Sequence, residues 1–137
     1  MAAPEPLRRA WLETEYRVRL PRGGYAVIRI GAPLPQALHG CLRDADEPWG
    51  FITAWNPHAR RASDATNRAR QRELRDALRA LGARYRAGVG AGKDWRESSL
   101  FVAGPDFETL DALGRRFGQA ALVRGIGCGT AELRELD

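Results

Sequence analysis

Glu97 is the residue of this sequence best placed for acid/base chemistry. It stands at the mouth of the apolar segment that ends at residue 103, where burial would raise the pKa of its carboxyl group. An exposed carboxylate paired with Arg96 or with another of the many arginines is at least an equally good interpretation. Nucleophilic catalysis has candidates, but no spacing joins a nucleophile to a base; these candidates are Ser98, Ser99, Cys128, His39 and His58.

Three amide side chains mark the ends of predicted elements. Asn56 follows an apolar segment and precedes Pro57, which favours an extended backbone at Asn56 and the end of a strand there. Asn67 opens the clearest helical pattern on its buried side, and Gln119 follows a predicted helix. Elements that pack on one sheet bring such ends together at its rim. We therefore expect Asn56, Asn67, Glu97 and Gln119 to converge in one cleft.

Two glycine-rich segments fail the tests for nucleotide-binding loops. Residues 87–94 begin with alanine where a phosphate-binding loop requires glycine, and Asp94 occupies the position of the Ser or Thr that holds magnesium. Residues 125–129 precede a predicted strand, whereas a dinucleotide fingerprint precedes a helix. Cys41 and Cys128 have no Cys or His at metal-ligand spacing. The sequence thus predicts two loops and indicates no cofactor, no metal site and no disulfide.

Arginine dominates the charge of this chain. The net charge is +5, and of the 22 basic residues only Lys93 is lysine. Four arginines recur with helical spacing and form a stripe that could follow the phosphates of a nucleic acid, with an affinity that falls as salt rises. A solvated helix face in a chain with a general bias toward arginine is the simpler interpretation, since acidic residues interrupt the stripe. The arginine stripe consists of Arg68, Arg72, Arg75 and Arg79.

The length and composition are those of one globular domain. A chain of 137 residues with 44% apolar residues can fill one core, so we expect a single domain over residues 1–137, with residues 1–6 as a flexible tail. No segment has the pattern of a signal peptide or the roughly 20 apolar residues of a membrane span. We expect a cytoplasmic protein.

Apolar periodicity predicts the order of the elements. Alternation in residues 14–20 and 25–30 predicts a hairpin, and leucine spacing predicts a helix over residues 67–81 with Leu74 and Leu78 facing the core. Short connections favour a mainly antiparallel or mixed sheet with helices packed on it, an α+β fold in the order α-β-β-α-β-α-β-β-α-β-β. The other predicted helices cover residues 4–11, 34–42 and 107–117, and the other strands residues 51–54, 84–89, 98–103, 120–123 and 130–136.

Several of these residues fall in motifs that resemble a family of small bacterial proteins, domain of unknown function 3293. The resemblance extends from about residue 7 to residue 136. It implies a bacterial, cytoplasmic protein of one domain and assigns no activity. The motifs that carry it are Thr53-Ala54-x-Asn56-Pro57, Phe117-Gly118-Gln119-x-Ala121 and Trp95-x-Glu97-x-Ser99, together with Tyr16 and Asn67. The resemblance groups six polar residues from different elements, namely Thr53, Asn56, Asn67, Glu97, Ser99 and Gln119.

A polar group of this kind has two interpretations. The amides and hydroxyls could satisfy one another and the loop backbone, since an unpaired buried polar group costs about 1–3 kcal/mol. They could instead line a pocket for a small polar ligand, with Glu97 able to transfer a proton. We favour a ligand-binding or regulatory domain. The alternatives are a small enzyme with Glu97 as acid or base and a nucleic-acid-binding module that uses the arginine stripe.

Overall fold

Seven strands form one sheet in the computed structural model, which describes residues 3–136. In chain order they are β1 (Glu15–Arg19), β2 (Tyr25–Ile28), β3 (Pro48–Ile52), β4 (Arg84–Ala91), β5 (Arg96–Ala103), β6 (Ala121–Ile126) and β7 (Glu132–Glu135). Their order across the sheet is β2-β1-β4-β5-β3-β6-β7, and neighbouring strands are antiparallel. The predicted antiparallel sheet is confirmed.

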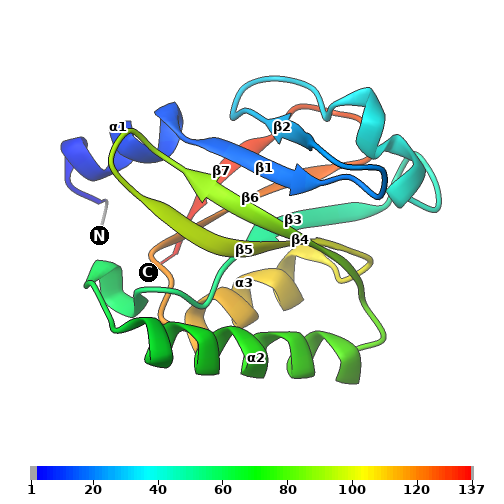
Figure 1. Ribbon diagram of the computed structural model, residues 1–137. Helices are drawn as coiled ribbons and strands as arrows, with labels where there is room; N and C mark the ends of the chain where they lie inside the picture. The colour runs from blue at the N-terminus through cyan, green and yellow to red at the C-terminus, as the bar shows by residue number, and fades with distance from the viewer. Residues whose placement is uncertain (1–2, 137) are drawn as a thin grey trace.

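Helices accompany this sheet on one face and at its ends. The α-helices are α1 (Glu5–Glu13), α2 (Asp64–Ala80) and α3 (Phe107–Arg116), and the 3-10 helices are η1 (Gln36–Cys41) and η2 (Pro57–Ala59). In Figure 1, α2 and α3 lie side by side on one face of the sheet. With η1 in the place of the second predicted helix, the elements follow the predicted α+β order, to which η2 is an addition.

Each face of the sheet carries a core of its own, because side chains alternate along a strand. Leu74 and Leu78 of α2 have no exposed surface and pack on the face that includes Ile52, as the leucine spacing predicts. On the opposite face, the ring centroids of Trp49 and Phe101 lie 5.6 Å apart. The centre of the sheet is therefore buried on both sides, which accounts for the nearly continuous apolar segments of β3 and β5.

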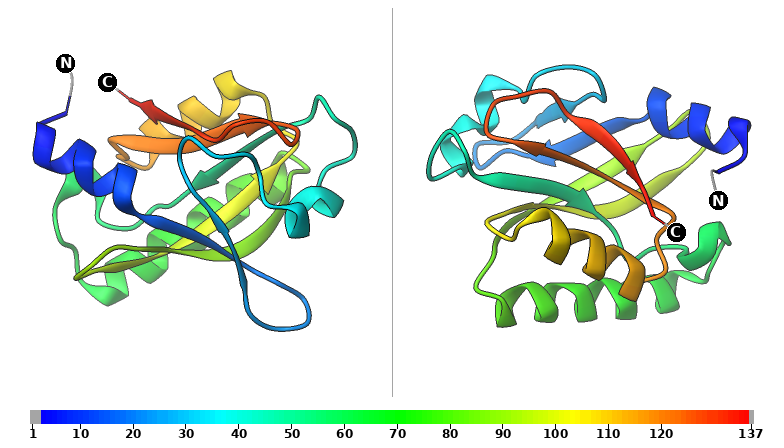
Figure 2. Two further views of the ribbon diagram at one scale, coloured as in Figure 1. Left: turned by 90° about the horizontal axis from the view of Figure 1, so that it is seen from above. Right: turned by 180° about the vertical axis from the view of Figure 1, so that it is seen from behind.

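The sheet curls so that the segments beside its edge strands meet (Figure 2). The backbone N–H of Gly31, after β2, donates a hydrogen bond to the carbonyl of Ala131, before β7, at 2.9 Å. The Ala131 N–H donates in turn to the carbonyl of Ala32 at 2.9 Å, and an isolated bridge joins Pro33 to Thr130. The core that contains Trp49 lies inside this curl. Its two ends are flanked by η1 and α1 (Figure 1).

Polar contacts hold α1 against the end of the curled sheet. Arg8 donates hydrogen bonds to Glu135 Oε2 of β7 from Nη2 at 2.8 Å and from Nε at 3.1 Å. The Tyr16 hydroxyl of β1 donates to the carbonyl of Trp11 at 2.6 Å, and the hydroxyl of Thr14 donates to the carbonyl of Ala10 at 2.6 Å. No residue of α1 is buried. These polar contacts hold α1 in position, and none of its residues belongs to either core.

The glycine-rich loop predicted around residues 88–92 belongs in large part to a strand. β4 continues to Ala91, and its hairpin with β5 places Gly90 opposite Glu97. A Cβ atom at Gly88 would lie 2.7 Å from the carbonyl oxygen of Arg17 and 2.9 Å from the Phe51 ring. Glycine is required at this position because the neighbouring strand and the core ring approach too closely for any side chain.

Several element boundaries differ from the predicted ones. α2 begins at Asp64 and not at residue 67, because the Ser63 hydroxyl accepts a hydrogen bond from the Thr66 N–H at 3.1 Å and caps the helix. Asn67 therefore lies in the first turn of the helix, where it is buried. β5 begins two residues earlier than predicted, so Glu97 lies within the strand. β6 extends through part of the predicted turn, β2 ends at Ile28, and η1 is a 3-10 helix where an ordinary helix was expected.

The helices within residues 3–136 include none that is both long enough and apolar enough to cross a membrane. The flexible tail expected over residues 1–6 falls in part on residues 1–2, outside the described residues. Glu5 and Pro6 belong to α1, and the Ala3 N–H donates a hydrogen bond to Glu135 Oε1 at 3.1 Å.

Candidate functional site

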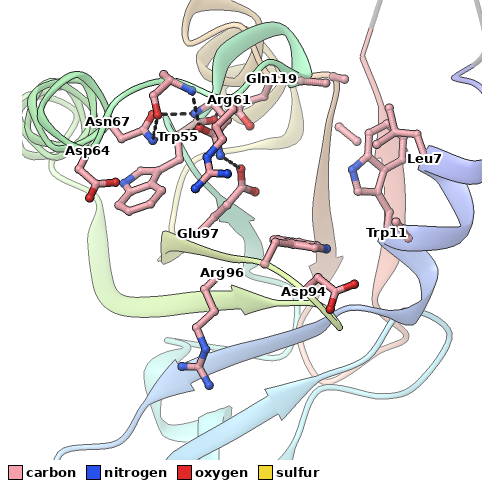
Figure 3. Close-up of a pocket in the computed structure, with 17 residues that line it drawn as sticks. Leu7, Trp11, Trp55, Arg61, Asp64, Asn67, Asp94, Arg96, Glu97 and Gln119 are labelled. Atoms are coloured by element: carbon pink, nitrogen blue, oxygen red, sulfur yellow. Dashed lines mark hydrogen bonds between the residues drawn. The ribbon is translucent and has the colours of Figure 1, made fainter.

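An open pocket of about 530 Å³ lies where α1 faces the end of the sheet (Figure 3). We call it the main pocket; its volume falls within the range of roughly 300–1,000 Å³ that is usual for small-molecule sites. Its lining comes from α1, the connection between β3 and α2, the β4–β5 hairpin and the segment between α3 and β6. The main contributions are Leu7, Ala10 and Trp11; Trp55, Asn56, Arg61 and Asn67; Asp94, Trp95 and Glu97; and Gln119 and Ala121.

Glu97 projects into this pocket from β5 (Figure 3). Its Oε2 atom accepts a hydrogen bond from Asn56 Nδ2 at 2.8 Å. Its Oε1 atom has no hydrogen-bond partner among residues 3–136. Burial raises the pKa of the Glu97 carboxyl, and the hydrogen bond from Asn56 opposes part of that rise. One oxygen is thus fixed by the protein, whereas the other remains open to an added group.

Asn56 and Asn67 lock each other in place behind Glu97. Asn67 Nδ2 donates to Asn56 Oδ1 at 3.0 Å, and Asn67 Oδ1 accepts from the backbone N–H of Asn56 at 2.8 Å. Asn56 Oδ1 also accepts from the Ala62 N–H at 3.0 Å. These bonds occupy most of the capacity of Asn67, which is 2% exposed. Asn67 therefore orients Asn56, and Asn56 orients Glu97.

The loop that carries Asn56 has an unusual backbone. Asn56, His58 and Ala59 have φ angles of 46°, 61° and 57°, in the left-handed region that non-glycine residues rarely adopt. The extended conformation predicted for Asn56 is therefore wrong, and β3 ends earlier, at Ile52. Tertiary contacts hold the loop in this form: besides the bonds between Asn56 and Asn67, the His58 N–H donates to the Gly118 carbonyl at 2.7 Å.

Gln119 contributes a second acceptor to the main pocket. Its Nε2 atom donates to the carbonyls of Trp55 at 3.0 Å and Phe117 at 3.2 Å. Both amide hydrogens therefore have acceptors, and the amide cannot rotate without losing them. The Oε1 atom of Gln119 has no partner in the described part of the chain. Like Glu97, this side chain is held at one end and open at the other.

A smaller space of about 60 Å³, the inner chamber, adjoins the main pocket, and Glu97 and Gln119 line both. Thr53 and Ser99 line the inner chamber. The Thr53 hydroxyl donates to the Ser98 carbonyl at 2.6 Å and accepts from the Trp55 N–H at 3.0 Å. The Ser99 hydroxyl donates to the backbone carbonyl of Glu97 at 3.1 Å. These two hydroxyls thus brace the strand and loop that carry the site.

Tyr16 connects the inner chamber to α1. Its ring lines the chamber, and its hydroxyl donates to the carbonyl of Trp11. Burial raises the pKa of the Tyr16 phenol, and the charge of Glu97 acts in the same direction. Tyr16 is therefore a neutral group close enough to Glu97 to feel its charge.

Aromatic side chains form much of the pocket, and residue-by-residue reasoning missed this. Trp11, Trp55 and Trp95 all line it. Trp55 Nε1 is buried without a hydrogen-bond partner within residues 3–136. A signal for one of them existed: Trp95 precedes Glu97 by two residues, a spacing that would put both side chains on the same side of a strand. No local signal indicates Trp11, whose position depends on how α1 docks.

Charged side chains surround the opening of the pocket. Arg61, Asp64, Asp94 and Arg96 line it and are exposed. Figure 3 shows the Arg61 side chain extending toward Glu97, whereas that of Arg96 points away from it. Neither arginine forms an ion pair with Glu97 in the part of the chain that the structure describes.

The structure thus brings Asn56, Asn67, Glu97 and Gln119 together in one pocket and places Thr53 and Ser99 directly behind them. The arginine stripe lies outside this pocket, along α2. Arg68, Arg72 and Arg79 are exposed and Arg75 is half-buried, while Arg79 bonds to the Tyr85 hydroxyl at 3.0 Å and pairs with Asp76. The nucleophile and base candidates Cys128, His39 and His58 do not line the main pocket.

Comparison with known proteins gives one result. The family model described as "Protein of unknown function (DUF3293)" matches residues 52–122, more than half of the chain. The matched segment contains Asn56, Asn67, Glu97 and Gln119 but not α1 or β1. No curated protein and no solved structure matches the chain.

Proposed function

Since the chain belongs to the DUF3293 family of proteins of unknown function, whose description assigns no activity, we propose from the pocket geometry that it binds a small polar ligand at Glu97. We propose further that it acts as a ligand-binding or regulatory protein, in the single-domain, cytoplasmic and bacterial setting expected from the sequence.

The open oxygen of Glu97 is the observation that carries this proposal. Glu97 is largely buried, its Oε2 atom is engaged by Asn56, and its Oε1 atom has no partner within the described residues. A hydrogen bond from a ligand donor to an ionised carboxylate is stronger than one between neutral groups. A ligand donor at Oε1 would gain such a bond without displacing a hydrogen bond among the described residues.

The hydrogen-bond pattern argues against a purely structural role for the whole group. Three side chains form their hydrogen bonds with the backbone or with Asn56, namely those of Asn67, Thr53 and Ser99. These bonds support a structural role for the three residues. Glu97 and Gln119 differ, because each keeps an acceptor oxygen on the pocket side. Asn67, Thr53 and Ser99 thus support the site, whereas Glu97 and Gln119 offer acceptor oxygens to a ligand.

Acid/base catalysis at Glu97 is the second candidate, and the raised pKa of its carboxyl favours it. The lining of the main pocket includes no Ser, Thr, Cys or His within the described residues that could serve as a nucleophile beside Glu97. An enzyme built on this pocket would therefore use Glu97 to move a proton of the ligand itself.

A thermal-shift screen of small polar metabolites tests the proposal. The screen compares wild type, Glu97→Gln and a matched control, Glu73→Gln, which makes the same change at an exposed position of α2 outside the pocket. A metabolite that raises the melting temperature of wild type and of Glu73→Gln, but not of Glu97→Gln, supports a ligand site at Glu97. Equal responses in all three proteins, or none in any, contradict it. Turnover of the metabolite by wild type alone would favour the enzyme.

A further inference from the structure

Glu97 is an exception among the buried and half-buried carboxylates of this protein. Glu15, Glu47, Asp111 and Glu135 each form an ion pair with at least one arginine. Glu97 forms none within residues 3–136, although the chain contains 22 basic residues. Burial favours the neutral form of an unpaired carboxyl group, whereas a cation beside it favours the ionised form. A cation beside Glu97 would therefore compensate the burial of its carboxylate.

Both open atoms at the junction of the main pocket and the inner chamber are hydrogen-bond acceptors. They are Glu97 Oε1 and Gln119 Oε1, and both side chains line both spaces. An ionised carboxylate and an amide oxygen cannot donate to a ligand. A ligand that satisfies both must bring at least two N–H or O–H donors. Ammonium, amidinium and guanidinium groups bring such donors together with positive charge.

The walls of the main pocket also suit a cation. The indole rings of Trp11, Trp55 and Trp95 line it, and indole faces attract cations more strongly than other aromatic faces do. Of the charged side chains in the lining, Asp64, Asp94 and Glu97 are acidic, against Arg61 and Arg96. Arg61 is exposed and makes no ion pair with Glu97, so a ligand cation does not have to break an existing bond to reach the carboxylate.

The inner chamber limits the size of the ligand beyond its charged group. Its volume is about 60 Å³, against about 530 Å³ for the main pocket. Phe51, Leu122 and Val123 contribute apolar surface to it, and Thr53 and Ser99 contribute polar surface. Any part of the ligand that passes beyond Glu97 must be short, and its larger body must remain among the indole rings.

We propose that the main pocket binds a small organic cation whose N–H donors bond to Glu97 Oε1 and Gln119 Oε1 and whose apolar body contacts the indole rings. This inference rests on the proposed function and specifies the charge of the ligand. Glu97 is ionised in the complex, and the cation takes the place that arginine holds beside the other carboxylates.

Four probes with one common ring isolate the charge of the ligand. Benzylammonium and benzamidinium are cations, benzamide is neutral, and benzoate is an anion. Isothermal titration with wild type should give binding of both cations about tenfold or more tighter than of benzamide, and no binding of benzoate, since only the cations add a charged donor to the bond with the carboxylate. Glu97→Gln should lose that preference, whereas Glu73→Gln should keep it.

The pH dependence of wild type supplies a second test, which does not require any variant to fold. Affinity for benzamidinium should fall as pH is lowered through the raised pKa of Glu97, because the protonated carboxyl no longer attracts a cation. Affinity for benzamide should change less over the same interval. The other titratable or charged groups that line the two spaces are Tyr16 of β1, Asp64 of α2, Asp94 and Arg96 of the β4–β5 hairpin and Arg61 of the β3–α2 connection. The variant Asp94→Asn identifies any contribution of the exposed carboxylate on the hairpin.

The outcomes separate this inference from the proposed function. Binding of benzamide or benzoate, but of neither cation, overturns the assignment of a cation and leaves a ligand-binding pocket in place. Equal binding of the cations by wild type and Glu97→Gln also overturns it, because the indole rings alone would then account for the affinity. If wild type binds none of the four probes, the assignment fails, and the metabolite screen then decides on ligand binding itself.

Discussion

Asp111 and Glu97 are both largely buried carboxylates, and the protein treats them in opposite ways. Asp111 of α3 is 6% exposed and accepts hydrogen bonds from Arg124 Nη1 at 3.3 and 3.4 Å and from Arg134 Nε at 3.0 Å. Glu97 accepts one hydrogen bond, from a neutral amide, and burial raises the pKa of its carboxyl group. The fold thus pairs the carboxylate of Asp111 with two arginines and leaves the carboxylate of Glu97 without a cation.

Strand register explains the difference. β6 and β7 pair so that Arg124 lies opposite Glu132 and Arg134 lies opposite Leu122, which places both guanidinium groups within reach of Asp111. Glu97 lies opposite Gly90 on β4, which has no side chain to offer, and β3 ends before it reaches this part of β5. The facing position on β4 is a glycine that lines the inner chamber, so neither neighbouring strand offers Glu97 a charged partner.

Removal of the charge of Asp111 should have the largest effect on stability. Asp111→Asn leaves Arg134 without its carboxylate and Arg124 with Glu132 alone. We expect a loss of about 2–4 kcal/mol in the free energy of unfolding, below the value for a fully buried pair because Arg134 is partly exposed. Urea denaturation measures this loss. Asp76→Asn, in an exposed pair with Arg79, is the control and should change stability by about 0.5 kcal/mol or less.

Asn67→Ala should have the second largest effect, because it removes the support of the open carboxylate without touching the carboxylate itself. The backbone N–H of Asn56 loses its acceptor, and the Oδ1 atom of Asn56 loses one of its two donors and keeps the Ala62 N–H. We expect a loss of about 1–3 kcal/mol, measured by the same denaturation. A variant as stable as wild type would show that the loop does not need this amide pair to hold Glu97.

Glu97→Gln should change stability in a pH-dependent way. Below pH 4.5, the ordinary pKa of the group, the carboxyl is protonated in both the folded and the unfolded state. As pH rises through the raised pKa of the folded state, the unfolded state ionises more readily, so wild type loses stability relative to the variant. Denaturation curves from below pH 4.5 to neutral pH should therefore show that the free energy of unfolding of the variant rises relative to that of wild type. A constant difference would mean that folding does not raise the pKa of Glu97.

Charge reversal on the arginine stripe should have the smallest effect on stability. Arg68 and Arg72 are exposed and form no ion pair within the described residues, so Arg68→Glu with Arg72→Glu should change the free energy of unfolding by about 0.5 kcal/mol for each substitution or less. If the stripe binds nucleic acid, the double variant should bind more weakly at every sequence, and the affinity of wild type should fall steeply with salt. No binding of RNA or DNA by wild type at low ionic strength would exclude that function.

Local patterns predicted the elements because each pattern has a local cause. The alternation at Tyr16 and Val18 predicted β1, and the leucine spacing predicted the buried face of α2. The curl of the sheet was beyond such reasoning, since it depends on hydrogen bonds between Gly31 and Ala131, one hundred positions apart in the chain. The extension of β4 through Gly88 and Gly90 was missed for the same reason, because these glycines pair with the neighbouring strands β1 and β5 and do not form a turn.

The convergence of Asn56, Asn67, Glu97 and Gln119 could be predicted because each lies near the end of an element on one sheet. Their hydrogen bonds could not. The left-handed backbone of Asn56 contradicts the expectation from Pro57, and in this conformation the Asn56 side chain bonds to both Glu97 and Asn67. The wall formed by Trp11 was also beyond prediction, because it follows from the contacts of α1 with β1 and β7.

The attachment of α1 has a consequence for how ligands reach Glu97. α1 forms one wall of the pocket, yet no residue of it is buried in either core. Separation of this helix from the sheet would break the bonds of Arg8 and Tyr16 and would expose the inner chamber, which Trp11 lines. Local opening of this kind requires less free energy than global unfolding. Opening of α1 would therefore widen access to Glu97 while the sheet stays folded.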